Sequence, residues 1–335
     1  MKFLIVRLSS LGDIVHTLPI VNALRQNSPD SQIDWLVGKS GFEFLSLVKE
    51  INNVYELNYK NILLIQKEKY DYTIDVQGLF KSAFLSKLSF GRKTIGFKNT
   101  REFADVFYDE KVNVGNLFKT KKHIVDINLE LISSSVKNND SKVKFLIPEI
   151  FESANTHIPK PTSQSVVVFP GTTWESKLWP MNYWFELIKN ISRDFQIFVC
   201  GSTDDLDFIN PLITKLDSEN IRYINLTGKT NIKNLIYLIQ NARLVIGMDS
   251  FGLHLSSAIK NDTGKPDVIG IYGPTSPIRN GPYNLINNCL HLSELECIAC
   301  RKKHCPLGHH ACMNNIIPSY VGDMIYSKMT DRDVS

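Results

Sequence analysis

Asp13 follows the first apolar strand pattern of this 335-residue chain and is its best candidate for a catalytic residue. Residues 3–6 are short and apolar, as in a buried parallel strand, and helical apolar spacing begins at Ile14. Ser10 and Gly12 make the turn between them small and polar. Ligands of open α/β sheets bind outside the carboxyl ends of strands, where free amides and helix N-termini meet. Asp13 therefore has two interpretations: a carboxylate that faces a substrate, or a plain helix N-cap, for which Asp is a favoured residue type.

A second strand pattern, at residues 72–76, is also followed by polar side chains. Gln77 comes directly after it, and Lys81 lies in the first turn of the next helix pattern. A lysine there opposes the helix dipole, which an anionic ligand nearby would explain, although the turn could be an ordinary crossing. Arg101 could clamp a phosphate or carboxylate with its forked guanidinium, or belong to a solvated basic loop. His16 could orient a substrate or have a structural role.

Two strand patterns in the second half, at residues 166–169 and 244–248, end in turns suited to an anion. In the first turn Lys177 supplies positive charge, and Thr172 and Thr173 supply hydroxyl donors. It is not a Walker loop, because the Gly-Lys-Ser/Thr ending is absent. The second turn offers helix-start amides, which favour a diphosphate. Its residues are Asp249, Ser250, Phe251, Gly252 and His254. Each turn alone could be a connector, but together they predict a nucleotide-type ligand.

Four of the six cysteines lie in one short segment, residues 297–312. They are Cys297, Cys300, Cys305 and Cys312. Four thiolates at this spacing could bind structural zinc or iron, and reduced thiols or a structural clip are the alternatives. The spacing is too compact for a zinc ribbon, and the clustering does not fit the dispersed disulfides of a secreted scaffold.

Composition bounds the class of protein. The hydrophobic content of 43% supports well-filled cores, and the net charge of +4 with a pI near 8.6 gives no sign of a nucleic-acid-binding protein. A mildly basic chain suits an anionic substrate or a membrane surface. No apolar run approaches the roughly 18 residues that a spanning helix needs, and the first residues form a strand pattern instead of a signal peptide. We therefore expect a cytoplasmic protein.

Strand and helix patterns alternate along the chain, which predicts an α/β protein of two doubly wound parallel sheets. The expected strands are at residues 3–6, 33–36, 72–76, 94–97, 166–169, 196–200, 223–226, 244–248 and 268–272. The expected helices are at residues 14–26, 42–50, 78–88, 124–135, 184–191 and 232–240. A polar, proline-bearing stretch at residues 148–164 interrupts the alternation. We expect an N-terminal domain at residues 1–155 and a C-terminal domain at residues 156–335, facing each other across a cleft.

These motifs together resemble glycosyltransferase family 9, the bacterial lipopolysaccharide heptosyltransferases, and most closely the heptosyltransferase I branch. The specific stretches are residues 8–19 (Leu-Ser-Ser-Leu-Gly-Asp-Ile-Val-His-Thr-Leu-Pro), residues 70–83 and the Thr-Arg-Glu of residues 100–102. In the second half, Trp179-Pro180 and Gly273-Pro274-Thr275 also match the family. The resemblance covers nearly the whole chain.

The resemblance implies a GT-B enzyme of Gram-negative bacteria that moves heptose from ADP-heptose to a Kdo sugar of the lipid A inner core, with inversion. It implies that Asp13 is the general base, that the chemistry needs no cofactor, and that the C-terminal domain binds the donor. Donor contacts are implied for Thr172, Thr173, Lys177 and the turn of Asp249 to His254. Acceptor contacts are implied for Ser10, Gly12, His16, Gln77, Lys81, Arg101 and Lys122. Peripheral contact with the cytoplasmic face of the inner membrane is expected, and no contact with nucleic acid.

Three departures leave alternatives open. Phe251 displaces the glycine of the family's acid-hydroxyl-glycine turn, and Lys233 stands where heptosyltransferase I has an acid near the nucleoside. The cysteine segment is similar to that of members assigned to later heptose additions. The alternative is therefore a family member with another acceptor, either a second heptose or a protein, or with another nucleotide sugar. A Rossmann oxidoreductase lacks its Gly-x-Gly-x-x-Gly turn here, and a sugar-binding module would not need Asp13.

Overall fold

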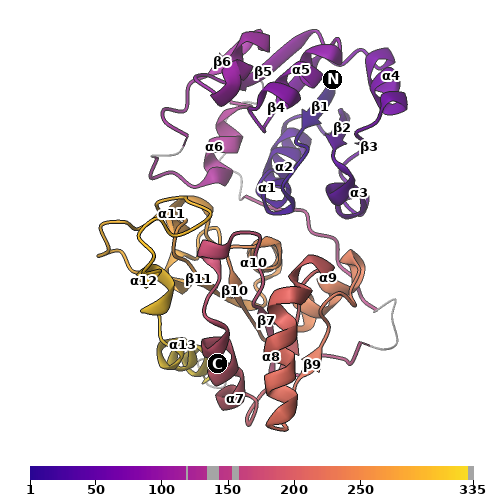
Figure 1. Cartoon of the computed structure of the whole chain (residues 1–335). Helices are drawn as coiled ribbons and strands as arrows, with labels where there is room; N and C mark the ends of the chain where they lie inside the picture. The colour runs from indigo at the N-terminus through magenta and orange to yellow at the C-terminus, as the bar shows by residue number, and fades with distance from the viewer. Residues whose placement is uncertain (118–119, 134–142, 153–157, 331–335) are drawn as a thin grey trace. The chain divides into compact units, whose positions relative to one another are not determined.

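The computed structural model describes residues 1–117, 120–133, 143–152 and 158–330. The chain divides into two units, Met1–Pro148 (unit 1) and Glu149–Ser335 (unit 2). Each unit holds one six-stranded sheet with helices packed around it (Figure 1). Among these described residues, no helix is both long enough and apolar enough to cross a membrane.

The sheet of unit 1 is parallel throughout, in the order β3-β2-β1-β4-β5-β6. Its strands are β1 (Lys2–Val6), β2 (Gln32–Val37), β3 (Asn53–Glu56), β4 (Tyr72–Asp75), β5 (Lys93–Phe97) and β6 (Glu110–Val112). Its helices are α1 (Leu11–Val15), α2 (Leu18–Asn27), α3 (Lys39–Leu45), α4 (Tyr59–Lys67), α5 (Phe80–Leu88), the 3-10 helix η1 (Arg101–Phe107) and α6 (Ile124–Glu130). The central strands are apolar and buried on both faces, as parallel sheets covered by helices must be.

The sheet of unit 2 is also parallel, in the order β12-β11-β10-β7-β8-β9. Its strands are β7 (Ser165–Phe169), β8 (Gln196–Val199), β9 (Ile224–Asn225), β10 (Leu244–Met248), β11 (Asp267–Ile271) and β12 (Cys289–Leu290). Its α-helices are α7 (Met181–Ile191), α8 (Leu206–Ser218), α9 (Ile232–Asn241), α10 (Phe251–Thr263), α11 (Pro277–Asn280), α12 (Ala311–Asn314) and α13 (Pro318–Thr330). Its 3-10 helices are η2 (Glu175–Lys177), η3 (Thr203–Asp205) and η4 (Ile286–Asn288).

Both sheets repeat one strand order, in which the first strand of the unit lies between the second and the fourth. The chain therefore changes direction across the sheet between β1 and β4, and again between β7 and β10. Such switch points are where ligands of open α/β sheets bind. The turns after these four strands carry the polar side chains that the sequence indicated.

All nine expected strands are present, but the short edge strands β3, β6 and β12 were not predicted. The single helix expected at residues 14–26 is wrong, because α1 ends at Val15 and α2 begins at Leu18. Thr17 turns its hydroxyl back onto the Asp13 carbonyl at 2.8 Å, and Pro19 then stands in the first turn of α2. The helix expected at residues 124–135 ends at Glu130, and its last two residues lie outside the described part of the chain.

Candidate functional site

Asp13 lies in the first turn of α1, directly after the carboxyl end of β1. Ser10 precedes this helix, and its backbone N–H and its hydroxyl donate to Asp13 Oδ2 at 3.2 and 2.9 Å. The same oxygen lies 2.7 Å from Nη2 of Arg7. The interpretation of Asp13 as a plain N-cap is wrong, because Ser10 is the N-cap of α1 and Asp13 is the third helical residue, which completes a capping box with Ser10. Asp13 also keeps a third of its side chain exposed. Capping and chemistry are therefore compatible at this residue.

Arg7 is the residue of this turn that the sequence did not identify. Its Nη1 donates to the carbonyl of Val76 at 2.8 Å, so the guanidinium bridges the turns after β1 and β4. Trp35 holds the Arg7 backbone by donating to its carbonyl at 3.2 Å. The available signal was a basic residue placed immediately after a buried strand, in the same turn as the acid.

The charge state of Asp13 follows from these contacts. Burial raises the pKa of the Asp13 carboxyl, but the Arg7 charge and the Ser10 hydrogen bonds together outweigh it, so the pKa lies below its ordinary value. Asp13 is therefore ionised at neutral pH. An ionised, partly exposed carboxylate at a strand's carboxyl end can accept a proton from a ligand hydroxyl.

The turn after β4 is held by a second, fully buried acid. Asp75 accepts from the backbone N–H groups of Gln77 and Gly78, from the Ser82 hydroxyl and from the Tyr108 hydroxyl, at 2.7–3.1 Å. Burial raises the pKa of Asp75 in spite of these four donors. Gln77 in turn accepts from the Leu8 backbone N–H at 2.7 Å. Asp75 thus fixes one turn, and Gln77 ties that turn to the Asp13 turn.

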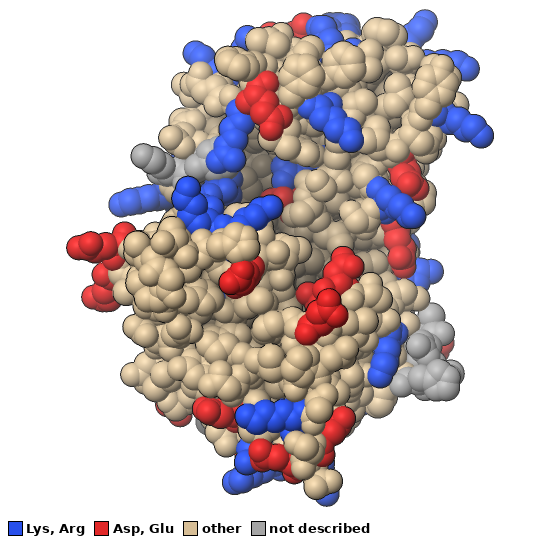
Figure 2. All heavy atoms as spheres, in the orientation of Figure 1, with Lys and Arg blue, Asp and Glu red and all other residues tan. Residues whose placement is uncertain are grey.

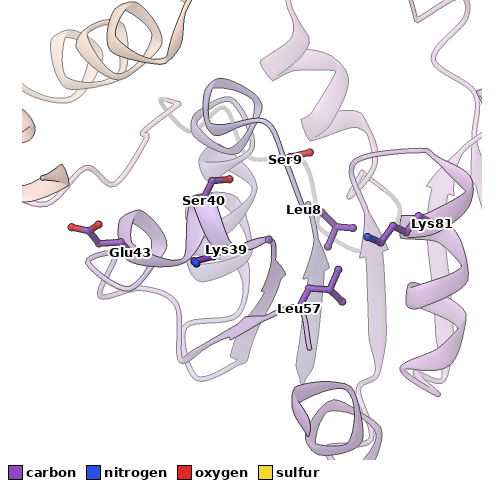
Figure 3. Close-up of a pocket in the computed structure, with 8 residues that line it drawn as sticks. Leu8, Ser9, Lys39, Ser40, Glu43, Leu57 and Lys81 are labelled. Carbon is purple, nitrogen blue, oxygen red and sulfur yellow. The ribbon is translucent and has the colours of Figure 1, made fainter. Parts of the chain in front are cut away.

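An open pocket of about 700 Å³ lies beside these turns in unit 1 (Figure 3). It is lined by Leu8, Ser9, Gly38, Lys39, Ser40, Glu43, Leu57 and Lys81. Lys81 points from α5 toward Leu8 and Leu57, so it brings a positive charge to the pocket wall. Gly38 has to be glycine, because a Cβ there would lie 2.7 Å from the Leu8 carbonyl oxygen.

The other residues expected around an acceptor lie at different depths in unit 1. Gly12 and His16 are buried, and the His16 ring meets the His123 ring edge-on at 5.4 Å. Arg101 is exposed at the start of η1. Lys122 is exposed and forms an ion pair with Glu130, N to O 2.5 Å.

In unit 2 the turns after β7 and β10 meet through buried charges. Nζ of Lys177 lies 2.7 Å from Oδ2 of Asp249, and Nε2 of His254 lies 2.9 Å from Oδ1. The Thr172 hydroxyl donates to the Asp249 carbonyl at 3.2 Å. Burial raises the pKa of Asp249, but Lys177 and His254 outweigh it and hold the pKa far below the ordinary value. Sequence reasoning selected these residues but did not foresee that Lys177 pairs with Asp249.

The other residues expected to contact a donor lie around this cluster. Thr173 is exposed in the β7 turn, Ser250 is the N-cap of α10, and Phe251 is the first residue of that helix. Gly252 packs its bare backbone against the ring of Phe169, which a Cβ would approach to 2.5 Å.

The contact at Gly252 leads to a prediction. Gly252→Ala should lower the free energy of unfolding by about 1–3 kcal/mol, because the methyl group must displace a packed aromatic ring. Urea unfolding followed by tryptophan fluorescence measures this loss. The control is Ser327→Ala on the exposed side of α13, which should change the free energy of unfolding little. Equal losses in the two variants would contradict the packing argument.

The cysteine segment packs against the β7 turn. The Ser176 backbone N–H donates to the Lys303 carbonyl at 3.0 Å, and the His310 ring contacts the Ser176 carbonyl at 2.6 Å. The Arg301 N–H also donates to the Pro274 carbonyl at 2.8 Å, in the turn after β11. Residues 301–310 therefore act as a brace for two of the turns of unit 2.

The four cysteine thiols are neighbours in unit 2, since Cys297, Cys300 and Cys305 all act on the charge state of Cys312. Within the described ranges of the chain, no group of three or more His, Cys, Asp or Glu side chains is placed to hold a metal ion. Cys312 is buried, and burial together with the neighbouring thiols of Cys300, Cys297 and Cys305 raises its pKa to about 11. Backbone N–H groups of His310 and Leu307 lower the pKa of Cys305.

Comparison with known proteins identifies the family. The model of glycosyltransferase family 9 (heptosyltransferase) matches residues 62–311, about three quarters of the chain. The chain belongs to glycosyltransferase family 9. The protein is therefore a glycosyltransferase, and the family expected from the motifs is confirmed.

Relatives of this family-9 glycosyltransferase align with most of its length. The lipooligosaccharide heptosyltransferase 2 of Campylobacter jejuni is 28% identical over 93% of this chain and 94% of its own. The lipopolysaccharide heptosyltransferase 1 of Escherichia coli is 26% identical over 84% of this chain and 91% of its own. The structure of the E. coli heptosyltransferase WaaC with ADP matches with a TM-score of 0.75 at 23% identity, over 98% of this chain and 100% of that one. This likeness confirms the expected GT-B type of fold, with two Rossmann-like sheets.

Proposed function

We propose that this glycosyltransferase moves heptose from ADP-heptose to a Kdo sugar of the lipid A inner core, with inversion at the anomeric carbon. Membership of the heptosyltransferase family and the similarity to lipopolysaccharide heptosyltransferase 1 support the sugar and the pathway. The observation that carries the mechanism is Asp13, an ionised and partly exposed carboxylate at the switch point of unit 1.

In this proposal Asp13 accepts the proton of the acceptor hydroxyl as that oxygen attacks the anomeric carbon of the donor. The bond from that carbon to the diphosphate breaks, and ADP leaves. Arg7 keeps the Asp13 carboxylate ionised and oriented, and by lowering its pKa it also makes Asp13 a weaker base. Acceptor binding by the remaining residues is also proposed: Ser10, Gly12, His16, Gln77, Lys81, Arg101 and Lys122. Their cations suit an anionic Kdo-lipid A.

The donor diphosphate is proposed to bind in unit 2, at the turns after β7 and β10. The Lys177 ammonium can bind the diphosphate while it keeps its ion pair with Asp249. The backbone amides at the start of α10 supply hydrogen-bond donors to the same group. Thr275, in the turn after β11, supports the proposal, because its buried hydroxyl has no hydrogen-bond partner among the described residues. Thr172, Thr173, Ser250, Phe251, Gly252 and His254 complete this proposed site. Residues 1–155 would then bind the acceptor and residues 156–335 the donor.

The test is ADP release from ADP-heptose with Kdo-lipid A as acceptor. We expect turnover with this pair and none with UDP- or GDP-sugars. No turnover with Kdo-lipid A, but turnover with the same lipid already carrying one heptose, would support the second candidate, addition of the second heptose. Similarity to a heptosyltransferase 2 at 28% identity favours that candidate. Release of ADP without any acceptor dependence would contradict both.

Two further proposals concern the surroundings of the reaction. The enzyme is proposed to work at the cytoplasmic face of the inner membrane, where a lipid acceptor would be held. A structural zinc or iron is proposed at Cys297, Cys300, Cys305 and Cys312. Their spacing and the proximity of their thiols support it, although no group of three or more ligands among the described residues is already placed to hold an ion. Metal analysis of the reduced protein decides the second proposal, with Cys297→Ser as the control, and a metal-free wild-type protein refutes it.

A further inference from the structure

Unit 1 exposes a cluster of phenylalanines that no part of the proposed chemistry uses. Its members, called here the phenylalanine surface, are Phe80 and Phe84 of α5 and Phe103, Val106 and Phe107 of η1. The rings of Phe80 and Phe107 lie 5.3 Å apart, those of Phe84 and Phe107 5.9 Å, and those of Phe80 and Phe84 6.4 Å. The rings of Phe80, Phe84 and Phe107 form one contiguous cluster, and Phe103 and Val106 are exposed on the same η1 segment as Phe107. Single exposed apolar residues need no explanation, but such a group does.

The phenylalanine surface is held outward by the local backbone. Phe103 is 80% exposed, Val106 65%, Phe80 50% and Phe84 45%. Glu102 and Phe103 both have left-handed backbone angles, with φ of 59° and 55°, which cost energy for residues with side chains. The Glu102 carboxylate accepts from the Phe80 backbone N–H at 3.2 Å and so fixes η1 to the start of α5. An ordered, strained turn that exposes a phenylalanine indicates a use for it.

The charge around the phenylalanine surface is positive. Residues 80–107 carry six basic side chains and two acidic ones. Of the six, Lys87 and Lys93 form ion pairs with Asp109 and Glu110, and the others are exposed: Lys81, Arg92, Lys98 and Arg101. Figure 2 shows several Lys and Arg side chains, with an acidic side chain among them, on the part of unit 1 that holds α5, β5 and β6. Apolar side chains flanked by cations are the pattern that binds the interface of an anionic membrane.

We propose that the phenylalanine surface inserts into the headgroup region of an anionic lipid bilayer. Its apolar rings enter the boundary with the acyl chains, while the flanking cations contact anionic headgroups. Lys81, in the wall of the unit 1 pocket, is the next residue after Phe80, so the pocket adjoins the surface. The choice of a bilayer rests on the proposed function, because the proposed acceptor is a membrane lipid. Docking there would place that lipid's sugar beside the Asp13 turn.

Vesicle sedimentation with the full chain tests this inference. We expect binding to vesicles of phosphatidylethanolamine and phosphatidylglycerol, weaker binding as salt is added, and little binding to phosphatidylcholine alone. Phe103→Ser with Val106→Ser should weaken binding by about tenfold or more, since two apolar side chains are lost from the interface. Phe151→Ser is the matched control, because Phe151 is 83% exposed but belongs to unit 2, and it should bind as the wild type does.

Two results would overturn the inference. One is equal vesicle binding by the wild type and the Phe103/Val106 variant. The other is that the wild type is a dimer and the variant a monomer, while both bind vesicles equally. That result would assign the surface to contact with a second copy of the chain.

An activity measurement separates this inference from the proposed function. The Phe103/Val106 variant should turn over an acceptor without acyl chains as fast as the wild type, and should be slower only on acceptor embedded in vesicles. A wild type inactive on every acceptor would refute the proposed function, while the vesicle-binding comparison would still decide the membrane surface.

Discussion

Asp13→Asn is expected to lower kcat for sugar transfer by about 10²- to 10⁴-fold, the usual contribution of a general base. The amide keeps the size of the side chain and can still accept the Ser10 hydrogen bonds, but it cannot take up a proton. ADP release measured with saturating ADP-heptose and acceptor gives kcat directly. Far-UV circular dichroism and ADP binding should match the wild type, which excludes a folding defect. Unchanged turnover would refute Asp13 as the base.

The pH profile tests the pairing of Asp13 with Arg7. The pKa of Asp13 is lowered in the folded protein, so activity should be lost only as the pH falls below the ordinary carboxyl range near 4. Arg7→Gln removes the positive charge that counteracts the effect of burial, so the pKa of Asp13 rises. The acid limb of kcat/KM then moves to higher pH. Arg7→Lys keeps the charge and should move the limb less. An identical acid limb in wild type and Arg7→Gln would contradict the tuning role.

Lys177→Met is expected to lower the free energy of unfolding of unit 2 by about 3–5 kcal/mol, because it leaves the Asp249 carboxylate buried without its ammonium partner. Three of the four tryptophans belong to unit 2, so urea unfolding followed by their fluorescence reports on it. Lys189→Met is the matched control. Its ion pair with Glu219 is exposed, and removal should cost less than about 1 kcal/mol.

The same pair predicts a pH dependence. Because the pKa of Asp249 is lowered on folding, the stabilisation from this carboxylate is present above the unfolded pKa near 4 and is lost as the pH falls. In Lys177→Met the carboxyl gains a proton more easily, so the difference from the wild type should shrink on acidification. Asp249→Asn added to Lys177→Met should recover part of the lost stability. A pH-independent difference, with no recovery in the double variant, would contradict the buried-charge explanation.

Local sequence predicted the elements and the positions of the polar turns, since strand and helix patterns act within about ten residues. Asp13, Lys177 and Asp249 were found because each follows a buried strand. Their partners were not foreseen. Arg7 reaches Val76 and Lys177 reaches Asp249, contacts 69 and 72 residues apart that depend on which strands become neighbours. The edge strand β12, which was not predicted, pairs over only two residues, too few for a strand pattern to identify.

The cysteine segment shows the same limit. Its spacing suggested a metal site, which stays a prediction, but gave no sign of its contacts with the turns after β7 and β11. The spacing of cysteines along the chain does not predict which turns the backbone of the segment contacts. The contact between His310 and Ser176, 134 residues apart, appears only in the folded unit.

The brace at residues 301–310 has a consequence for the order in which the enzyme becomes competent during synthesis. The turns of unit 1 take their contacts from residues up to Asn128, which donates to the His16 carbonyl, so they can close while the ribosome is still making the second half. The β7 turn, in contrast, obtains its Lys303 and His310 contacts only when nearly the whole chain has emerged. A ribosome-bound or prematurely terminated chain would thus carry a finished Asp13 turn and an unsupported β7 turn. Truncation near the C-terminus should therefore affect the proposed donor site in unit 2 before it affects unit 1.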